Sequence, residues 1–193
     1  MNNFTTNTYE LKREICNFSE KIANGTSKPA KKFVMETQYG LAKGGSCLVS
    51  NMARALDEDI KLNYTIDRLC DNFANLDDEY EKIIWRNYIN EVKKHINTKE
   101  PIAIFDDSDI NKEYSKKLED LDRVRDASSP DKRIVNGYNV CEAVLLSKNT
   151  NQPISVYSKI YSCKSKNFKS KNTYTLDSIK ACLLYTSDAA DEL

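Results

Sequence analysis

A cluster of acidic side chains follows a short apolar run near the middle of the chain. Ile102 to Phe105 precede Asp106, and the segment IAIFDDSDINKEY adds Asp107, Ser108 and Asp109. A carboxylate at the end of a buried strand is held rigidly, and carboxylate oxygens are the hard ligands that Mg²⁺ prefers. The cluster is therefore a candidate magnesium site. The alternative interpretation is a helix cap or a solvated turn, where acidic residues more often occur.

The rest of the composition favours carboxylate chemistry over other catalytic chemistries. His95 is the only histidine, so sites that need a histidine base are poor candidates. The six cysteines are widely separated and form no CxxC pair, which predicts reduced, mostly buried thiols and no zinc site. No apolar run is long enough to span a membrane, and no signal peptide is recognisable, so we expect a cytoplasmic protein.

The first half of the chain is predicted to be helical. Its first helix carries an apolar stripe at helical spacing, formed by Leu11, Ile15, Phe18 and Ile22. A second helix is expected to begin at Pro29 and to end at Gly40. Ser46 and Thr65 are expected to cap two short helices, and a longer helix is expected from Asp77.

The second half is predicted to form a small sheet. Ile102–Phe105 is typical of a buried strand, and Tyr138–Leu146 and Ile154–Tyr161 are expected to form a hairpin across the turn-rich Ser147–Gln152. Thr175 is expected to cap a last helix. The pattern predicts an α+β chain, with a helical domain over 1–97 and an α/β domain over 101–181.

Segments of the second half resemble, in order, the catalytic domain of bacterial insertion-sequence DDE transposases. They are IFDDSDINK, LDRVRDASS, GYNVCEAVLL, PISVYSKIYS and NTYTLDSIKA, which lie within Ile102–Ala181. The resemblance implies the first three strands and one helix of a truncated RNase H-like domain. It also implies that Asp106 is the first of three carboxylates that bind Mg²⁺ or Mn²⁺, with Asp107 as the second choice. The second Asp and the Glu of the family are expected beyond Ala181.

The last twelve residues differ in character from the helix that precedes them. CLLYTSDAADEL, Cys182–Leu193, resembles in its codons the transposon-end adapter used to prepare sequencing libraries. We therefore expect the natural frame to stop near Ala181, and the tail over 182–193 to pack poorly. The chain would then be an N-terminal fragment that cannot cleave DNA, because two metal ions across a scissile phosphate need more than one carboxylate.

Two regions are candidates for DNA contact. SCLVSNMARALDEDIKLNYTIDRLC resembles a helix-turn-helix and contains Arg54 and Arg68. A stretch without acidic residues, from Lys159 to Lys171, mixes aromatic residues with further lysines, of which Lys164, Lys166, Lys169 and Lys171 are the candidates for phosphate contact. The alternative for each of these basic residues is an ordinary solvated face.

The sequence thus predicts part of a DNA transposase that binds transposon-end DNA, self-associates in a synaptic complex and has no membrane partner. One alternative is a helical DNA-binding regulator without enzymatic activity. Another is a metal-dependent RNase H-like nuclease that acts without transposon ends. The acidic cluster separates these hypotheses, because a regulator has no need for adjacent carboxylates after a strand, whereas a metal nuclease does.

Overall fold

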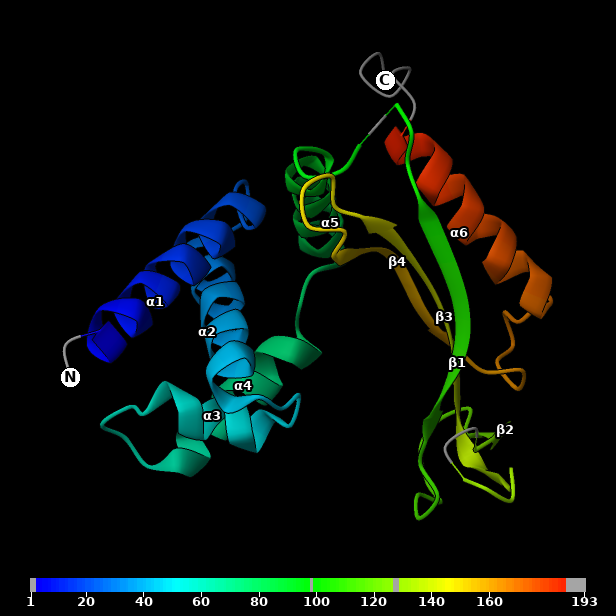
Figure 1. Ribbon diagram of the computed structural model, residues 1–193. Helices are drawn as coiled ribbons and strands as arrows, with labels where there is room; N and C mark the ends of the chain where they lie inside the picture. Colours follow the sequence, from blue (N-terminus) through cyan, green and yellow to red (C-terminus); the bar gives the residue numbers. More distant parts are fainter. Residues whose placement is uncertain (1–2, 98, 127–128, 187–193) are drawn as a thin grey trace. The chain divides into compact units, whose positions relative to one another are not determined.

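The chain forms two compact units, Met1–Glu91 and Val92–Leu193. The computed structural model describes residues 3–97, 99–126 and 129–186 (Figure 1). Helices make up the first unit: α1 (Asn3–Ile22), α2 (Lys28–Gly44), α3 (Val49–Leu56), α4 (Leu62–Ala74) and most of α5 (Asp78–Lys93). The second unit contains β1 (Ala103–Asn111), β2 (Asp122–Arg125), β3 (Ile134–Leu146), β4 (Pro153–Tyr161) and α6 (Lys171–Thr186). The predicted mixture of helix and sheet is confirmed.

Helix α2 begins as its sequence predicts but ends later. The Ser27 side chain accepts a hydrogen bond from the Ala30 amide, and Pro29 lies in the first turn. The expected end at Gly40 is wrong, because the helix continues to Gly44 and Gly45 closes it in the left-handed conformation. Gly40 serves packing instead: an added Cβ there would lie 2.9 Å from Met52 Cβ on α3.

The two expected serine and threonine caps are also wrong. Leu48 occupies the N-cap of α3, and Ser46 Oγ accepts a hydrogen bond from the Leu48 amide before the helix begins. Thr65 lies buried inside α4, where its hydroxyl donates to Glu58 Oε2 at 2.7 Å. The helix expected from Asp77 is confirmed to within one residue, and Asp77 Oδ1 accepts a hydrogen bond from the Glu79 amide.

Apolar packing in the helical unit falls into two clusters. One is centred on Leu69 of α4, with Phe33, Met52 and Ala53. The other joins Ile22, Ala23 and Val34 to the partly buried Phe18, Ile84 and Tyr88. The helical stripe read from the sequence of α1 therefore enters this second cluster only through its last turns, while Leu11 is exposed.

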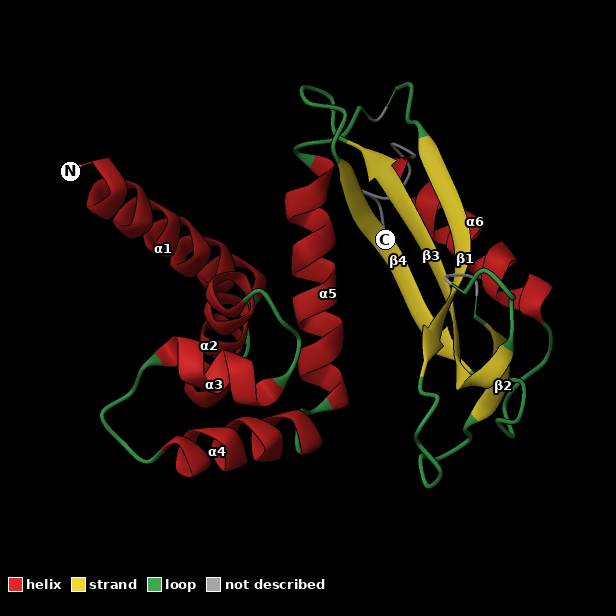
Figure 2. Ribbon diagram, turned by 60° about the horizontal axis from the view of Figure 1, so that its bottom comes forward, coloured by secondary structure: helices red, strands yellow, loops and turns green. Residues whose placement is uncertain are grey.

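A four-stranded antiparallel sheet is built around β3 (Figure 2). β1 pairs with β3 along one edge, from Ala103 opposite Leu145 to Asn111 opposite Gly137. β4 takes the other edge, and the short β2 pairs with the first residues of β3. The predicted hairpin across Ser147–Gln152 is confirmed as β3 and β4. Strand β2 was not predicted, and β3 begins at Ile134, earlier than expected.

The expectation of a short buried strand that ends at Phe105 is wrong. β1 is nine residues long, its residues up to Ser108 are exposed, and Asp106, Asp107 and Asp109 lie within it. The reason is its place in the sheet, because backbone pairing with β3 continues to Asn111 whatever the side chains are. Within the described residues β1 pairs with β3 alone, so β1 stands at the edge of the sheet.

Helix α6 packs on one face of the sheet, against β3 and β4. It begins at Lys171, ahead of the expected cap at Thr175, and the Ser170 hydroxyl accepts the Thr173 amide instead. It continues to Thr186, and Cys182 is 5% exposed, so the expectation that the tail packs poorly is wrong for Cys182. Residues 187–193 of that tail lie outside the described residues. None of the described helices has the length and apolar character needed to cross a bilayer.

Candidate active site

Asp106 and Asp107 lie on opposite faces of the sheet. Asp107 is directly opposite Cys141 on β3, and Asp106 is directly opposite Glu142. Directly opposed residues of an antiparallel pair point to the same face, and successive residues alternate. The two candidate ligands therefore cannot act together at one site. Their environments differ because α6 covers only one of the two faces.

Asp107 shares the face that α6 covers. Cys141 is buried, and so is Ser178 on α6. At the start of the same helix, Lys171 Nζ donates to Asn139 Oδ1 at 3.2 Å, and Asn139 lies two residues before Cys141 on the same face of β3. Asp106 instead lies on the other face of the sheet, in register with Glu142 and Ser158.

Two neutral polar groups lie near the exposed Asp107 carboxylate. Burial raises the pKa of the Cys141 thiol to about 11, and the neighbouring Asp107 charge adds to that rise, while a hydrogen bond with Ser178 opposes it. Burial and then the Asp107 charge raise the pKa of Tyr161 to about 12. The thiol and the phenol therefore stay protonated at neutral pH, and Asp107 is the carboxylate whose charge acts on both of them.

Asp107 alone does not complete a metal centre. Among the described residues, no group of three or more His, Cys, Asp or Glu side chains is arranged to hold a metal ion. Asp109 follows on the same face of β1, opposite Asn139. The described residues thus offer Asp107 as a first ligand, and a two-ion centre would require further carboxylates.

The two candidate arginines of the helical unit have partners within that unit. Both terminal nitrogens of Arg68 are 2.6 Å from carboxylates, one on Glu36 and one on Glu58. A hydrogen bond from Thr65 lowers the pKa of Glu58, and Arg68 lowers it further, although burial acts in the opposite direction. Arg54 donates to Ser50 O and to Asn51 Oδ1. Arg68 is thus committed to a network between α2, α4 and the segment before α4.

The candidate lysines of the second unit divide into two kinds. Lys164 Nζ donates to Leu121 O at 2.6 Å, and Lys171 donates to Asn139. These bonds fix the segment between β4 and α6 onto the sheet. Lys166 and Lys169 lie in that segment and are exposed. They are therefore better placed than Lys164 or Lys171 to approach a phosphate.

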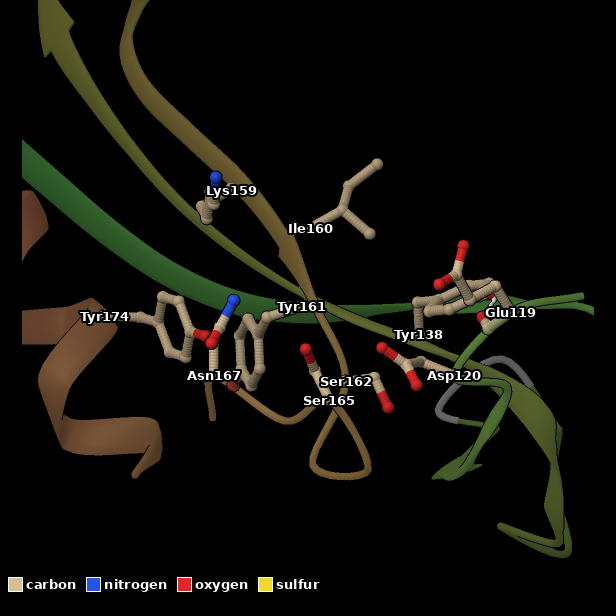
Figure 3. Close-up of a pocket in the computed structure, with 10 residues that line it drawn as sticks. All are labelled: Glu119, Asp120, Tyr138, Lys159, Ile160, Tyr161, Ser162, Ser165, Asn167 and Tyr174. Atoms are coloured by element: carbon tan, nitrogen blue, oxygen red, sulfur yellow. Dashed lines mark hydrogen bonds between the residues drawn. The ribbon is translucent and has the colours of Figure 1, made fainter. Parts of the chain in front are cut away.

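A pocket of about 390 Å³ opens where β4 ends and β2 begins (Figure 3). Asp122, the first residue of β2, helps to close this junction, because its Oδ2 accepts the Cys163 amide at 2.8 Å. Burial alone would raise the pKa of Asp122, but hydrogen bonds from the Arg123 and Cys163 amides and the charge of Lys164 lower it. Sequence reasoning missed this pocket, because the pairing of β2 that forms it leaves no periodic signal in a four-residue strand.

Comparison with family models, with curated proteins and with solved structures found no match for this chain. The second unit combines an antiparallel sheet covered on one face by a helix, an aspartate on that face, and a lysine-bearing segment that joins β4 to this helix.

Proposed function

We propose that this chain is part of a DDE-type DNA transposase, that it binds transposon-end DNA, and that Asp107 is its first metal ligand. The observation that carries the proposal is the position of Asp107 on β1, on the face covered by α6. The antiparallel order β1-β3-β4 followed by α6 is compatible with the first strands and first helix of an RNase H-like fold. The sequence resemblance of Ile102–Ala181 supports the same assignment.

The proposed chemistry is metal-dependent cleavage and joining of a phosphodiester. One Mg²⁺ or Mn²⁺ ion would activate a water or a 3′-hydroxyl, and a second would stabilise the leaving oxygen. Asp107 would hold one ion through its carboxylate, and the protonated Cys141 thiol beside it would add no competing charge. The family supplies two further carboxylates from segments that follow the helix corresponding to α6, so we expect the chain by itself to bind metal weakly and not to cleave DNA.

The DNA backbone would run along the segment between β4 and α6. Lys166 and Lys169 are exposed cations of this segment, which joins β4 to α6, the helix that covers the sheet face of Asp107. Binding through such lysines is electrostatic and falls steeply with salt, because each neutralised phosphate releases counterions. In the helical unit, the exposed face of α4 carries Asp67 and Asp71, which disfavours that helix as the main contact with phosphate.

The test is the salt dependence of binding to a fluorescein-labelled duplex, measured by anisotropy. We expect Lys166→Ala with Lys169→Ala to weaken binding and to reduce the slope of log K against log salt by about 2, since the slope changes by roughly 0.9 for each phosphate contact. Lys116→Ala with Lys117→Ala removes the same charge from an exposed loop of the same unit and serves as the matched control. Equal slopes for the two double variants would contradict the proposed contact.

Supercoiled plasmid with Mn²⁺ provides the second readout. We expect no nicking above background by the chain alone. Nicking that disappears in Asp107→Asn would instead assign a self-contained nuclease, the alternative function. If duplex DNA is not bound even at low salt, the transposase proposal itself fails.

A further inference from the structure

The pocket between β4 and β2 has one aromatic wall and one acidic wall. The rings of Tyr161 and Tyr174 stack with their centroids 4.1 Å apart and their planes inclined by 13°. Figure 3 shows these two rings on one side of the pocket, the side chains of Glu119, Asp120 and Tyr138 on the other, and the hydroxyl groups of Ser162 and Ser165 between them. A flat ligand with hydrogen-bonding groups on its edge matches this arrangement.

Backbone contacts hold both walls in place. The Tyr138 hydroxyl donates to Glu119 O at 2.5 Å, which fixes the loop before β2 against β3. On the other side, Ser162 Oγ accepts the Lys164 amide, and Lys164 Nζ reaches across the junction to Leu121 O. Asp120 adopts a left-handed backbone with φ of 52°, which aspartate and asparagine tolerate better than most residues. Both walls of the pocket are therefore held in place by contacts within the chain itself.

The charges of the pocket select the part of a nucleotide that can enter. The exposed carboxylates of Glu119 and Asp120 repel phosphate but accept hydrogen bonds from amino groups. Cytosine, adenine and guanine carry an exocyclic amino group and thymine does not, and acidic side chains are known partners of the cytosine amino group. Lys159 also lines the pocket, and the exposed Lys166 and Lys169 lie close in sequence to its lining residues Ser165 and Asn167, so these lysines are the candidates to hold the phosphates.

We propose that this pocket receives one unpaired base that carries an amino group, extruded from DNA bound along the lysine segment. The inference rests on the proposed function, since it takes that DNA as its ligand. Tyr161, which lines the pocket, pairs with Asn139, and Asp107 pairs with Cys141 two residues further along β3, so the aromatic wall of the pocket shares the sheet face of the proposed metal ligand. Extruding a base costs stacking energy, and least for a base that is already unpaired.

The test compares three fluorescein-labelled duplexes that differ at one position, which holds an unpaired deoxycytidine, an unpaired thymidine or an abasic site. We expect the deoxycytidine duplex to bind at least about fivefold more tightly than the other two, the lower end of the discrimination that such base contacts supply. In the double variant Glu119→Gln with Asp120→Asn, that ratio should fall towards one. Asparagine suits the backbone of Asp120, so this variant removes charge without straining the loop.

The matched control is Asp131→Asn, which removes an exposed acidic charge of the same unit outside the pocket. It should raise the affinity for all three duplexes slightly and leave their ratio unchanged. Equal affinities of the wild-type chain for the three duplexes would overturn the inference while the proposed function stands. If the chain binds no duplex, titration with free deoxycytidine and thymidine, followed by the NMR signals of the tyrosine rings, decides the pocket alone. Shifts of these signals with deoxycytidine but not with thymidine would support the inference, and equal effects of the two nucleosides would overturn it.

Discussion

Asp107 lies directly opposite Cys141 in the pairing of β1 with β3, so its carboxylate and the buried thiol share the sheet face covered by α6. The adjacent Asp106 shares the other face with Glu142. This register separates two neighbouring aspartates, of which the sequence resemblance favoured Asp106 and placed Asp107 second. It also lets hydrogen bonds run from Asp107, the proposed metal ligand, through Cys141 to Ser178.

The first prediction concerns metal binding by these two aspartates. Asp107→Asn should weaken Mn²⁺ binding roughly tenfold, a loss of about 1.4 kcal/mol, because it removes the charged ligand on the covered face. Asp106→Asn removes the same charge one residue away and should leave the affinity nearly unchanged. Electron paramagnetic resonance of free Mn²⁺ measures both. A larger loss in Asp106→Asn than in Asp107→Asn would reverse the assignment.

The second prediction concerns stability in alkali. The pKa of Cys141 rises from 9.0 to about 11 in the folded chain. Below pH 9 the thiol is protonated in both the folded and the unfolded chain, so its contribution to the free energy of unfolding is fully present there. Between pH 9 and 11 the unfolded chain loses this proton first, so stability falls by about 1.4 kcal/mol per pH unit for this one group. Tyr157 and Tyr161 add the same trend between pH 10 and 12.

Urea unfolding at a series of pH values measures this dependence. Cys141→Ala should lower stability at neutral pH yet flatten the decline between pH 9 and 11. Leu145→Ala is the matched control, because it removes buried apolar volume from the same strand without removing a titrating group. Its curve should be displaced at every pH with an unchanged slope. Parallel curves for both variants would show that Cys141 does not carry the effect.

The third prediction concerns Gly137, where β1, β2 and β3 meet. An added Cβ would lie 2.6 Å from Val124 Cγ2 and closer still to Ile110 O, so the backbone must move to admit it. Gly137→Ala should therefore reduce the free energy of unfolding by about 3 kcal/mol and loosen β2. Gly45→Asn offers a contrast, since its φ is 59° and nothing lies within 4 Å of an added Cβ. That change should cost less than about 1 kcal/mol.

The fourth prediction concerns the ion network of the helical unit. Arg68 bridges Glu36, which is largely buried, and Glu58. Arg68→Met keeps the apolar stem but leaves Glu36, among the described residues, with the 3.5 Å contact to Lys32 as its ion pair, so we expect a loss of about 2–3 kcal/mol in unfolding free energy. Arg54→Met should cost less than about 0.5 kcal/mol, because its contacts are exposed. Thermal unfolding followed by circular dichroism distinguishes the two.

The sequence alone determined the elements whose periodicity is local. The α+β composition, the helix from Asp77 and the hairpin across Ser147–Gln152 follow from apolar spacing and turn residues. The segment IAIFDDSDINKEY also contains β1, the strand on which we propose the metal ligand. In each case neighbouring residues carry the information, so a single chain read in order is sufficient.

Only the tertiary structure decided which aspartate faces the helix. Alternation along a strand shows that Asp106 and Asp107 point to opposite faces, but only the pairing with β3 and the packing of α6 show which face is covered. From the sequence, Thr65 was expected to cap a helix and Arg68 to contact a phosphate. Their partners Glu58 and Glu36 lie outside α4, in the segment before it and on α2, and such contacts leave no periodic pattern to read.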